Sequence, residues 1–392
     1  MDVEIHGLDE VNGGSSKSSN KTIEGIQCFL PASTDNTNAI ELSAVINPGS
    51  IRYVNNKACY QWSASIGYFV DDNGKKIDHP TGRTIKYIGG PEPGVGTISV
   101  GFTTADDLSG AHLDRGIGGT RTFHPYETYT VTVVDSVIDG LTDGKAYITA
   151  APSMPQGVSC HLNPSASGGT VQWNLKVAYD LFDAPPNQFS GNSSTWNISN
   201  ELNGTFCGGT ATLSYTLDGM KGMDKTFYIR GTNPTQSQIF SYASTIEEEA
   251  VCWKESSFRQ FNGTGLPLYG PPNGWGLMQK DPPPSLDYLW NWQVNLQGGV
   301  DYLNLIYGEA ETYLLGKYNP STWIWNPANR PDKIWDDAFC RYNSGKELYD
   351  DNGNVKDPNN PEYSEEYRAT LIAGINYSNS VRAIINNEPK PW

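Results

Sequence analysis

Residues 229–256 of this 392-residue chain read IRGTNPTQSQIFSYASTIEEEAVCWKES, and the hydrophobic pattern of the sequence changes within this stretch. Up to Gly231, apolar and polar side chains alternate, which is typical of β-strands. Asn233 fits the N-cap of a following helix, and Pro234 fits its first helical position. Beyond them, apolar residues fall on one helical face: Ile239, Tyr242, Ala243, Ile246, Ala250 and Trp253. The sequence therefore predicts a β part followed by a helical part.

The part before Gly231 is expected to be entirely β. Its short runs are rich in β-branched and aromatic residues, and Gly, Pro, Asn and Asp separate them. The runs are AIELSAVI, YQWSASIGYFV, RTIKYIG, TISVGF, ETYTVTVV and KAYITA, then VSCHLN, TVQWNLKVAYDLF, STWNIS, TATLSYTLDG and KTFYIRG. Asp-Asp-Asn-Gly at residues 71–74 predicts a hairpin turn. Runs of this length and spacing are typical of sandwich or immunoglobulin-like modules.

We expect four segments in the chain. These are a flexible tail over residues 1–21, a β domain over 22–151, an immunoglobulin-like β-sandwich domain over 152–232 and a mainly α-helical domain over 233–392. One larger β domain in place of the two β modules is the alternative. In the last segment, apolar faces predict helices at residues 300–314, 335–342 and about 361–386.

The charge of the chain argues against one class of partner. With 27 Lys+Arg against 43 Asp+Glu, the net charge is −16, whereas binding to duplex nucleic acid requires a basic surface. No apolar run is long enough to span a membrane as a helix. The first residues, MDVEIHGLDEVNGGSSKSSNK, have neither the basic start nor the apolar stretch of a signal peptide.

The cysteines and histidines show no metal-binding pattern. The five His form no HExxH pair, and the six Cys form no CxxC motif, so we expect neither a metal nor another cofactor. The cysteines are either buried thiols or form up to three disulfides: Cys28, Cys59, Cys160, Cys207, Cys252 and Cys340.

Glu255 comes directly after the first apolar helical face and lies about half a turn away from it. Taken alone, it fits an exposed glutamate at a helix end. However, the pieces WKESSFRQFN, PNGWGLMQKD, WNWQVNLQGGVDYL and CRYNSG occur in this order around and after it. This series resembles the lysozyme-like superfamily of goose-type lysozymes and soluble lytic transglycosylases. The family's pieces are a Glu-Ser pair ending a helix, a Gly-Leu-Met-Gln turn, an Asn-x-x-x-Gly helix start and a Tyr-Asn-Ala-Gly segment, and the resemblance covers roughly residues 235–386.

The resemblance implies a lysozyme-like fold for the helical domain and a role for Glu255 as general acid. This acid would protonate the bridging oxygen of the β-1,4 bond between N-acetylmuramic acid and N-acetylglucosamine. It must keep its proton near neutral pH, which an apolar cleft achieves by raising its pKa. The resemblance and the neighbouring sequence assign substrate binding to Ser256, Trp275, Met278, Gln279, Tyr342, Asn343 and Tyr377. Trp275 and Met278 are either cleft residues or core residues.

Two positions depart from the family pattern. Ser344 and Gly345 replace the usual Ala-Gly, a small change that should keep the tight turn. Asp281, two residues after Gln279, occupies a place where goose-type lysozymes carry Asp and lytic transglycosylases generally do not. It is either a catalytic base or a cap or turn residue before the Pro-rich run.

Asp281 bears on the type of reaction. An inverting hydrolase needs a base roughly 6.5–9.5 Å from the acid to activate water. In lytic transglycosylases, the 6-hydroxyl of muramic acid attacks internally and gives a 1,6-anhydro product. The likeness of NGWGLMQKD to goose-type lysozymes favours hydrolysis, with Asp281 as the base.

We therefore expect a modular muramidase that acts on the glycan strands of bacterial peptidoglycan. The β domains would recognise or dock, either on a secretion apparatus or on phage tail machinery. Without a signal peptide, the protein would reach the cell wall or periplasm by phage-type or specialised secretion delivery, as an antibacterial effector or a phage-related enzyme. The alternative is a noncatalytic glycan-binding or structural protein, such as a phage tail component or adhesin.

Overall fold

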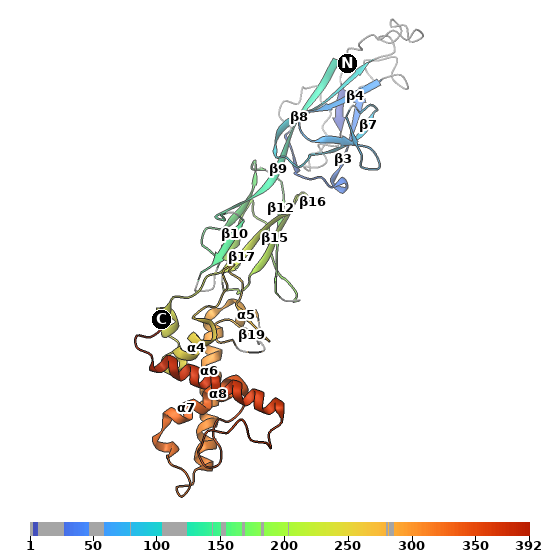
Figure 1. Ribbon diagram of the computed structural model, residues 1–392. Helices are drawn as coiled ribbons and strands as arrows, with labels where there is room; N and C mark the ends of the chain where they lie inside the picture. The colour runs from blue at the N-terminus through green and yellow to red at the C-terminus, as the bar shows by residue number, and fades with distance from the viewer. Residues whose placement is uncertain are drawn as a thin grey trace. The chain divides into compact units, whose positions relative to one another are not determined.

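The computed structural model of the chain describes residues 3–6, 27–46, 59–78, 80–103, 124–142, 144–149, 154–166, 169–181, 184–202, 204–279, 281 and 286–392 (Figure 1). The chain divides into two compact units. Unit 1 comprises Met1–Gly144, Gln156–Glu201 and Thr210–Tyr228, and unit 2 comprises Lys145–Pro155, Leu202–Gly209 and Ile229–Trp392. The described part of unit 1 consists of strands with two one-turn helices, and that of unit 2 is mainly helical. The predicted change from an all-β to a mainly helical region is confirmed.

Two sheets share the first core of unit 1. One sheet has the strand order β1–β3–β7–β5–β6, with bounds Val3–His6, Ile40–Ile46, Thr84–Ile88, Tyr68–Val70 and Lys76–Ile77. The other contains β4 (Cys59–Ala64), β8 (Gly94–Thr103) and β9 (His124–Asp139), and β2 (Gln27–Pro31) runs parallel to β9. Trp62 of β4 and Tyr87 of β7 are buried in one cluster, so side chains of both sheets fill the space between them.

β9 is long enough to pair with different strands along its length. Residues 124–133 of β9 pair with β8, and residues 135–139 pair with β11, which in turn pairs with β14. A further sheet contains β17, β15, β12 and β13 in that order, with β16 beside β15. Tyr215 of β15 donates a 2.9 Å hydrogen bond to the Val134 carbonyl oxygen of β9, which links these two layers. The bounds are Ser159–Asn163 for β11, Val171–Ala178 for β12, Asn187–Gly191 for β13, Thr195–Asn197 for β14, Gly209–Leu217 for β15, Met220–Lys221 for β16 and Lys225–Gly231 for β17; η1 (Asn36–Asn38) and α2 (Ile198–Glu201) are the one-turn helices.

The hairpin turn predicted at residues 71–74 is confirmed. β5 and β6 pair around it, the Asp71 N–H donates to the Lys75 oxygen at 2.9 Å, and Gly74 takes the φ of 77° that the turn needs.

The prediction of a tail over residues 1–21 is wrong for Val3–His6, because this short stretch pairs with the edge of β3 as β1. The rest of the predicted tail lies outside the described residues. The division of the β region near residue 152 stays a prediction.

Unit 2 is arranged around the long helix α6. The helices are α3 (Gln236–Phe240), α4 (Ile246–Ser256), α5 (Leu286–Trp290), α6 (Trp292–Lys317), α7 (Pro331–Ser344), α8 (Glu365–Asn386) and the one-turn η3 (Pro327–Asn329); the strands are β10 (Lys145–Ile148), β18 (Tyr269–Gly270) and β19 (Gly274–Trp275). α6 contacts α4, α5 and α7, and α8 contacts α4 and α7 (Figure 1). The three later helices predicted from the sequence are confirmed. In the described part of the chain, none of the helices combines the length and the apolar character needed to cross a bilayer.

The first predicted helix is in fact two helices. Thr235, rather than Asn233, is the N-cap of α3, and Thr245 is the N-cap of α4. Each threonine forms a capping box with the Gln or Glu three residues later, which satisfies backbone N–H groups at a new helix start. The helix therefore restarts at Thr245, although the apolar spacing continues across the break. Asn233 instead accepts the Phe261 N–H at 2.7 Å and donates to the Phe261 oxygen at 3.1 Å.

α6 carries Asn295 and Gly299 one turn apart, on the face that receives the turn at residues 276–279. The Asn295 side-chain oxygen accepts the Met278 N–H at 3.1 Å. A Cβ atom added to Gly299 would lie 2.3 Å from both Cβ and Cγ of Met278. The Asn-x-x-x-Gly spacing thus has a packing reason, because residues four apart share one helical face.

Gly299→Ala should lower the free energy of unfolding by about 1–3 kcal/mol, since an overpacked core must shift to admit the methyl group. Gly308→Ala in the same helix is the matched control, because an added Cβ there meets no atom within 4 Å. The control should be neutral or stabilise by up to about 1 kcal/mol. Urea unfolding of both variants measures the difference, and equal effects would contradict the packing argument.

Candidate active site

Glu255 lies in the last turn of α4, where the helix end is firmly held. Ser257 closes the helix in the left-handed conformation with φ 52°, and its N–H donates to the Trp253 oxygen at 2.8 Å. The buried Ser256 hydroxyl donates to the Cys252 oxygen at 3.2 Å and accepts the Arg259 N–H at 3.2 Å. Ser256, predicted to bind substrate, therefore has its hydroxyl occupied by the backbone of the helix end.

The Glu255 carboxyl group is half-buried, and its environment favours the protonated form. Burial raises its pKa from 4.5 to about 7, while the hydrogen bond from Tyr377 and the charge of Lys254 lower it to a smaller extent. The Tyr377 hydroxyl, on α8, donates to Glu255 Oε1 at 2.5 Å. Desolvation thus outweighs the interactions that stabilise the carboxylate. A carboxyl group with this pKa can hold a proton near neutral pH and release it.

Two tyrosines connect Glu255 to the turn at residues 276–279. The rings of Tyr377 and Tyr342 are stacked with centroids 6.2 Å apart and an interplanar angle of 20°. The Tyr342 hydroxyl, on α7, donates to the Met278 carbonyl oxygen at 2.7 Å. Burial and the charge of Glu255 raise the pKa of both phenols well above the usual value, so both remain hydrogen-bond donors. Four predicted site residues are therefore joined in one continuous series of contacts.

Two buried amides hold the turn at residues 276–279. Gln260 accepts the Leu277 N–H at 3.1 Å and donates to the Leu289 oxygen at 2.7 Å. Asn295 accepts the Met278 N–H and donates to the Trp275 oxygen at 2.9 Å. Both side chains are fully buried. Backbone groups that a loop would otherwise leave unpaired are thereby satisfied, which fixes the turn.

Gln279 ends this turn and packs on the β18–β19 hairpin. Its Nε2 donates to the Gly276 oxygen at 2.7 Å, and its Oε1 fills the space where Gly270 and Gly274 lack a Cβ. Trp275 is buried and its ring lies 4.7 Å from that of Tyr269, which is about half exposed. Met278 is fully buried in the core. The Gln279 amide thus faces the hairpin, and Trp275 and Met278 belong to the packed interior.

Strained backbone conformations occur next to Glu255 and at the end of the turn at residues 276–279. The described chain has four non-glycine residues with positive φ, and three of them are Ser257, Phe258 and Gln279, at 52°, 62° and 46°. Such conformations each cost on the order of 1–3 kcal/mol and persist only where the surroundings enforce them. Ser257 and Phe258 directly follow the helix end that carries Glu255, and Gln279 ends the turn at residues 276–279.

Asp281 and Asn343 lie apart from this series of contacts. Both are exposed. Asp281 accepts a 3.2 Å hydrogen bond from Asn273, and the contacts of the described residues connect neither Asp281 nor Asn343 to Glu255. The base role predicted for Asp281 stays a prediction.

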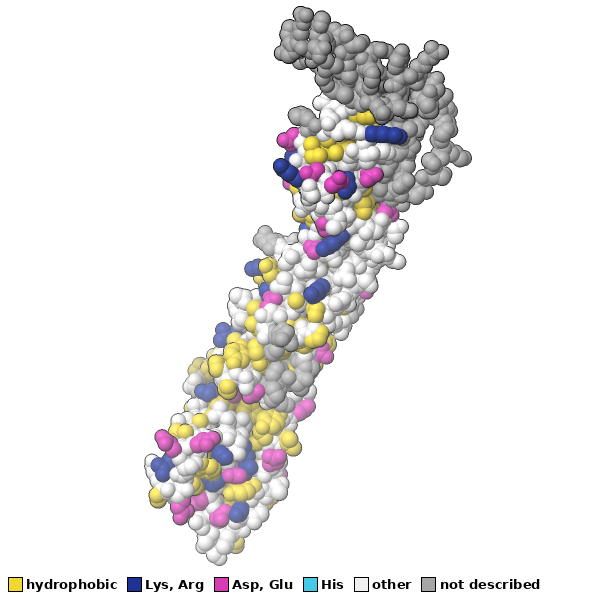
Figure 2. Space-filling view, turned by 90° about the vertical axis from the view of Figure 1, so that its right-hand side faces the viewer, with side chains coloured by type: hydrophobic (Ala, Val, Ile, Leu, Met, Phe, Trp, Pro, Cys, Tyr) yellow, Lys and Arg dark blue, Asp and Glu magenta, His cyan; other side chains and the backbone are white. Residues whose placement is uncertain are grey.

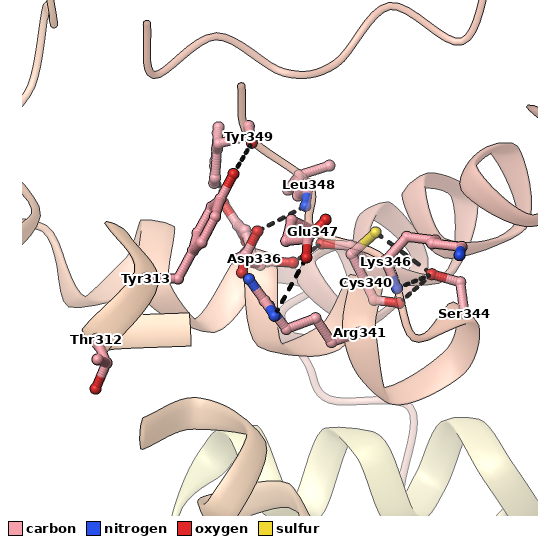
Figure 3. Close-up of polar contacts among 12 residues, drawn as sticks. Thr312, Tyr313, Asp336, Cys340, Arg341, Ser344, Lys346, Glu347, Leu348 and Tyr349 are labelled. Atoms are coloured by element: carbon pink, nitrogen blue, oxygen red, sulfur yellow. Dashed lines mark hydrogen bonds and ion pairs between the residues drawn. The ribbon is translucent and has the colours of Figure 1, made fainter. Parts of the chain in front are cut away.

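The far end of α7 is fixed by a polar cluster, which Figure 3 shows. Asp337, fully buried, accepts from the Arg341 guanidinium at 2.5 Å and from the Leu348 N–H at 2.6 Å. Glu347 lies 3.8 Å from Arg341 and 3.0 Å from Lys356. Gly345 closes the helix with φ 67°, so the turn expected at Ser344 and Gly345 is confirmed. This cluster anchors the helix that carries Tyr342.

Sequence reasoning missed the two amides that hold the turn. Asn295 belongs to the Asn-x-x-x-Gly piece, so the motif marks this residue, but it does not indicate the hydrogen bonds to Met278 and Trp275. Gln260 sits in WKESSFRQFN without a periodic signal, since its partners are 17 and 29 residues away along the chain.

No family model and no curated protein matches the chain. Solved structures that match include the D0-D1 domain of intimin, with 13% identity over 50% of this chain and 93% of that chain and a TM-score of 0.17. A two fibronectin type-III domain segment from chicken tenascin matches with 9% identity over 50% of this chain and 93% of that chain, TM-score 0.17. Sidekick-1 immunoglobulin domains 1-4 match with 13% identity over 53% of this chain and 46% of that chain, TM-score 0.16. Likeness at these TM-scores is slight.

Tyr377→Phe should raise the pKa of Glu255 above about 7, because it removes a hydrogen bond that stabilises the carboxylate while the ring stays in place. Carbon-13 NMR titration of the glutamate carboxyl groups, assigned with Glu255→Gln, measures the midpoint. Tyr367→Phe on the same helix is the control and should leave the midpoint unchanged. A midpoint that stays or falls in Tyr377→Phe would rule out this hydrogen bond.

Proposed function

We propose that unit 2 is a muramidase that cleaves the β-1,4 bond between N-acetylmuramic acid and N-acetylglucosamine in peptidoglycan, with Glu255 as general acid. The observation that carries the proposal is a half-buried carboxyl group with a pKa near 7, joined through Tyr377 and Tyr342 to the Gly-Leu-Met-Gln turn. A general acid works best with a pKa near the operating pH. The motif series around Glu255 supplies the substrate class.

The contacts of Glu255 suggest how the proton is delivered. Tyr377 donates to Oε1, so the proton of the acid form is carried by Oε2. Oε2 would donate it to the bridging oxygen as the bond from the anomeric carbon to that oxygen breaks. The resulting carboxylate would keep the Tyr377 hydrogen bond, which stabilises the charged form.

Two routes complete the reaction after the bond breaks. In hydrolysis, a base takes one proton from water while the oxygen attacks the anomeric carbon, and Asp281 is the candidate base. In transglycosylation, the 6-hydroxyl of the same muramic acid attacks and its proton passes to the Glu255 carboxylate. The exposed position of Asp281 is compatible with a base that meets solvent water.

The net charge of −16 argues against a strongly anionic polymer, such as a nucleic acid, as the substrate. On the face that Figure 2 shows, acidic and basic side chains of the described residues are interspersed. A glycan backbone presents hydroxyl and acetamido groups, which neutral hydrogen-bonding side chains recognise. We propose that the protein acts at the bacterial cell wall, where such glycan strands occur.

Glu255→Gln should reduce the clearing of purified peptidoglycan by about 10²–10⁴-fold, because it removes the proton that the leaving oxygen needs. Glu247→Gln, in the first turn of the same helix, is the matched control and should clear at the wild-type rate. The wild-type rate should fall as the pH rises through about 7, since the acid form is lost there. Turbidity measures both; no clearing by the wild type would favour the noncatalytic glycan-binding alternative, and equal clearing by Glu255→Gln would refute the acid.

Asp281→Asn should separate the two routes. It should abolish most hydrolysis if Asp281 activates water, and it should leave transglycosylation unchanged because that route needs no second carboxylate. Mass spectrometry of the released muropeptides identifies reducing ends or 1,6-anhydro ends. If the Asp281→Asn variant still releases reducing ends at the full rate, Asp281 has no part in the mechanism.

A further inference from the structure

Unit 1 contains a hollow of about 670 Å³ on the solvent face of the sheet formed by β13, β12 and β15. Asn174 of β12 pairs with Ser190 of β13 on one side and with Ser214 of β15 on the other, so these three side chains form a row across the sheet. The side chains that line the hollow from this face are amides and hydroxyls: Gln172, Asn174, Ser190, Asn192, Ser214 and Thr216. The volume falls within the roughly 300–1,000 Å³ of small-ligand sites.

The two walls of the hollow are fixed by hydrogen bonds. On one side, the Trp173 indole N–H donates to the Ser193 oxygen at 2.8 Å and holds the turn that carries Asn192. On the other side, the Asn38 side chain donates to the Lys221 oxygen at 2.6 Å and accepts the Lys221 N–H at 3.3 Å. Walls held in this way need little ordering when a ligand binds, which favours affinity.

The hollow is close to neutral in a chain of net charge −16. Its one charged lining residue, Lys221, forms an ion pair with Asp224 at 3.1 Å. The side-chain amides of Gln172, Asn174 and Asn192 are exposed and have no hydrogen-bond partner among the described residues. Each amide offers two donors and an acceptor. The hydroxyl groups of Ser190 and Thr216 can do both, and that of Ser214, which donates to the Asn174 backbone oxygen at 3.3 Å, can accept.

We propose that this hollow binds a neutral glycan through its hydroxyl and acetamido groups. Sugar hydroxyls both donate and accept, so they reproduce the hydrogen bonds of the waters that they displace from a floor of amides and hydroxyls. An anion would meet a lysine that is already paired, and an apolar peptide side chain would meet a polar floor. The site lies in the unit without Glu255, so it goes beyond the proposed cleavage and does not depend on it.

The experiment uses the full-length Glu255→Gln protein and a hexasaccharide of β-1,4-linked N-acetylglucosamine. The side-chain NH₂ resonances of Gln172, Asn174 and Asn192, assigned with their Ala variants, should shift in TROSY spectra during the titration. The NH₂ resonances of Asn273 and Gln279 report separately on unit 2, so failure of the hollow and failure of the proposed catalytic site are distinguishable.

The double variant Gln172→Ala/Asn174→Ala should weaken binding to the hollow at least tenfold. Lys176→Ala is the matched control, because Lys176 lies on the same strand and the same face, outside the hollow, and it should change the affinity less than twofold. Both variants alter exposed side chains, and circular dichroism checks their folding. Unshifted amides at the highest soluble concentration of the hexasaccharide would overturn the proposal, and so would shifts caused by inorganic phosphate but not by the sugar.

Discussion

The proposed chemistry of unit 2 depends on a balance of two opposing effects on one carboxyl group. Burial of Glu255 favours the neutral acid, and the hydrogen bond from Tyr377 favours the carboxylate. Because burial is the larger effect but not the only one, the pKa settles near 7, rather than so high that the proton could not leave. Without burial the group would be ionised near physiological pH, and without the hydrogen bond it would hold its proton more tightly.

The rest of unit 2 holds the side chains around Glu255 in the positions that set its pKa. α4 delivers Glu255, α8 delivers Tyr377 and α7 delivers Tyr342, so three helices must keep their mutual positions for the contacts to persist. The buried pair of Asp337 and Arg341 fixes α7, and Asn295 with Gly299 fixes the turn against α6. A buried charge without its partner is costly, so such a pair specifies one arrangement even where it adds little stability.

The sequence predicted what local patterns encode. Alternating residues predicted the strands, and the 3.6-residue period predicted α6, α7 and α8. It failed where two local signals conflicted, because the apolar face from Ile239 to Trp253 continues across a helix break that the capping box at Thr245 imposes. It named Glu255, Tyr342 and Tyr377, which the structure brings together, but it also named Asn343 and Asp281, which the contacts do not join to them. The role of Gln260 could not be predicted, since its hydrogen-bond partners, Leu277 and Leu289, are far away along the chain.

The buried cysteines of unit 2 affect how the unit responds to oxidants. Cys207, Cys252 and Cys340 are all buried thiols rather than disulfide partners, and burial raises the pKa of Cys340 to about 11. Thiols in this state react slowly with oxidants because the thiolate is scarce. Cys252 and Cys340 are therefore protected from oxidation where they lie, and the described part of unit 2 is held together by packing and hydrogen bonds rather than by disulfides.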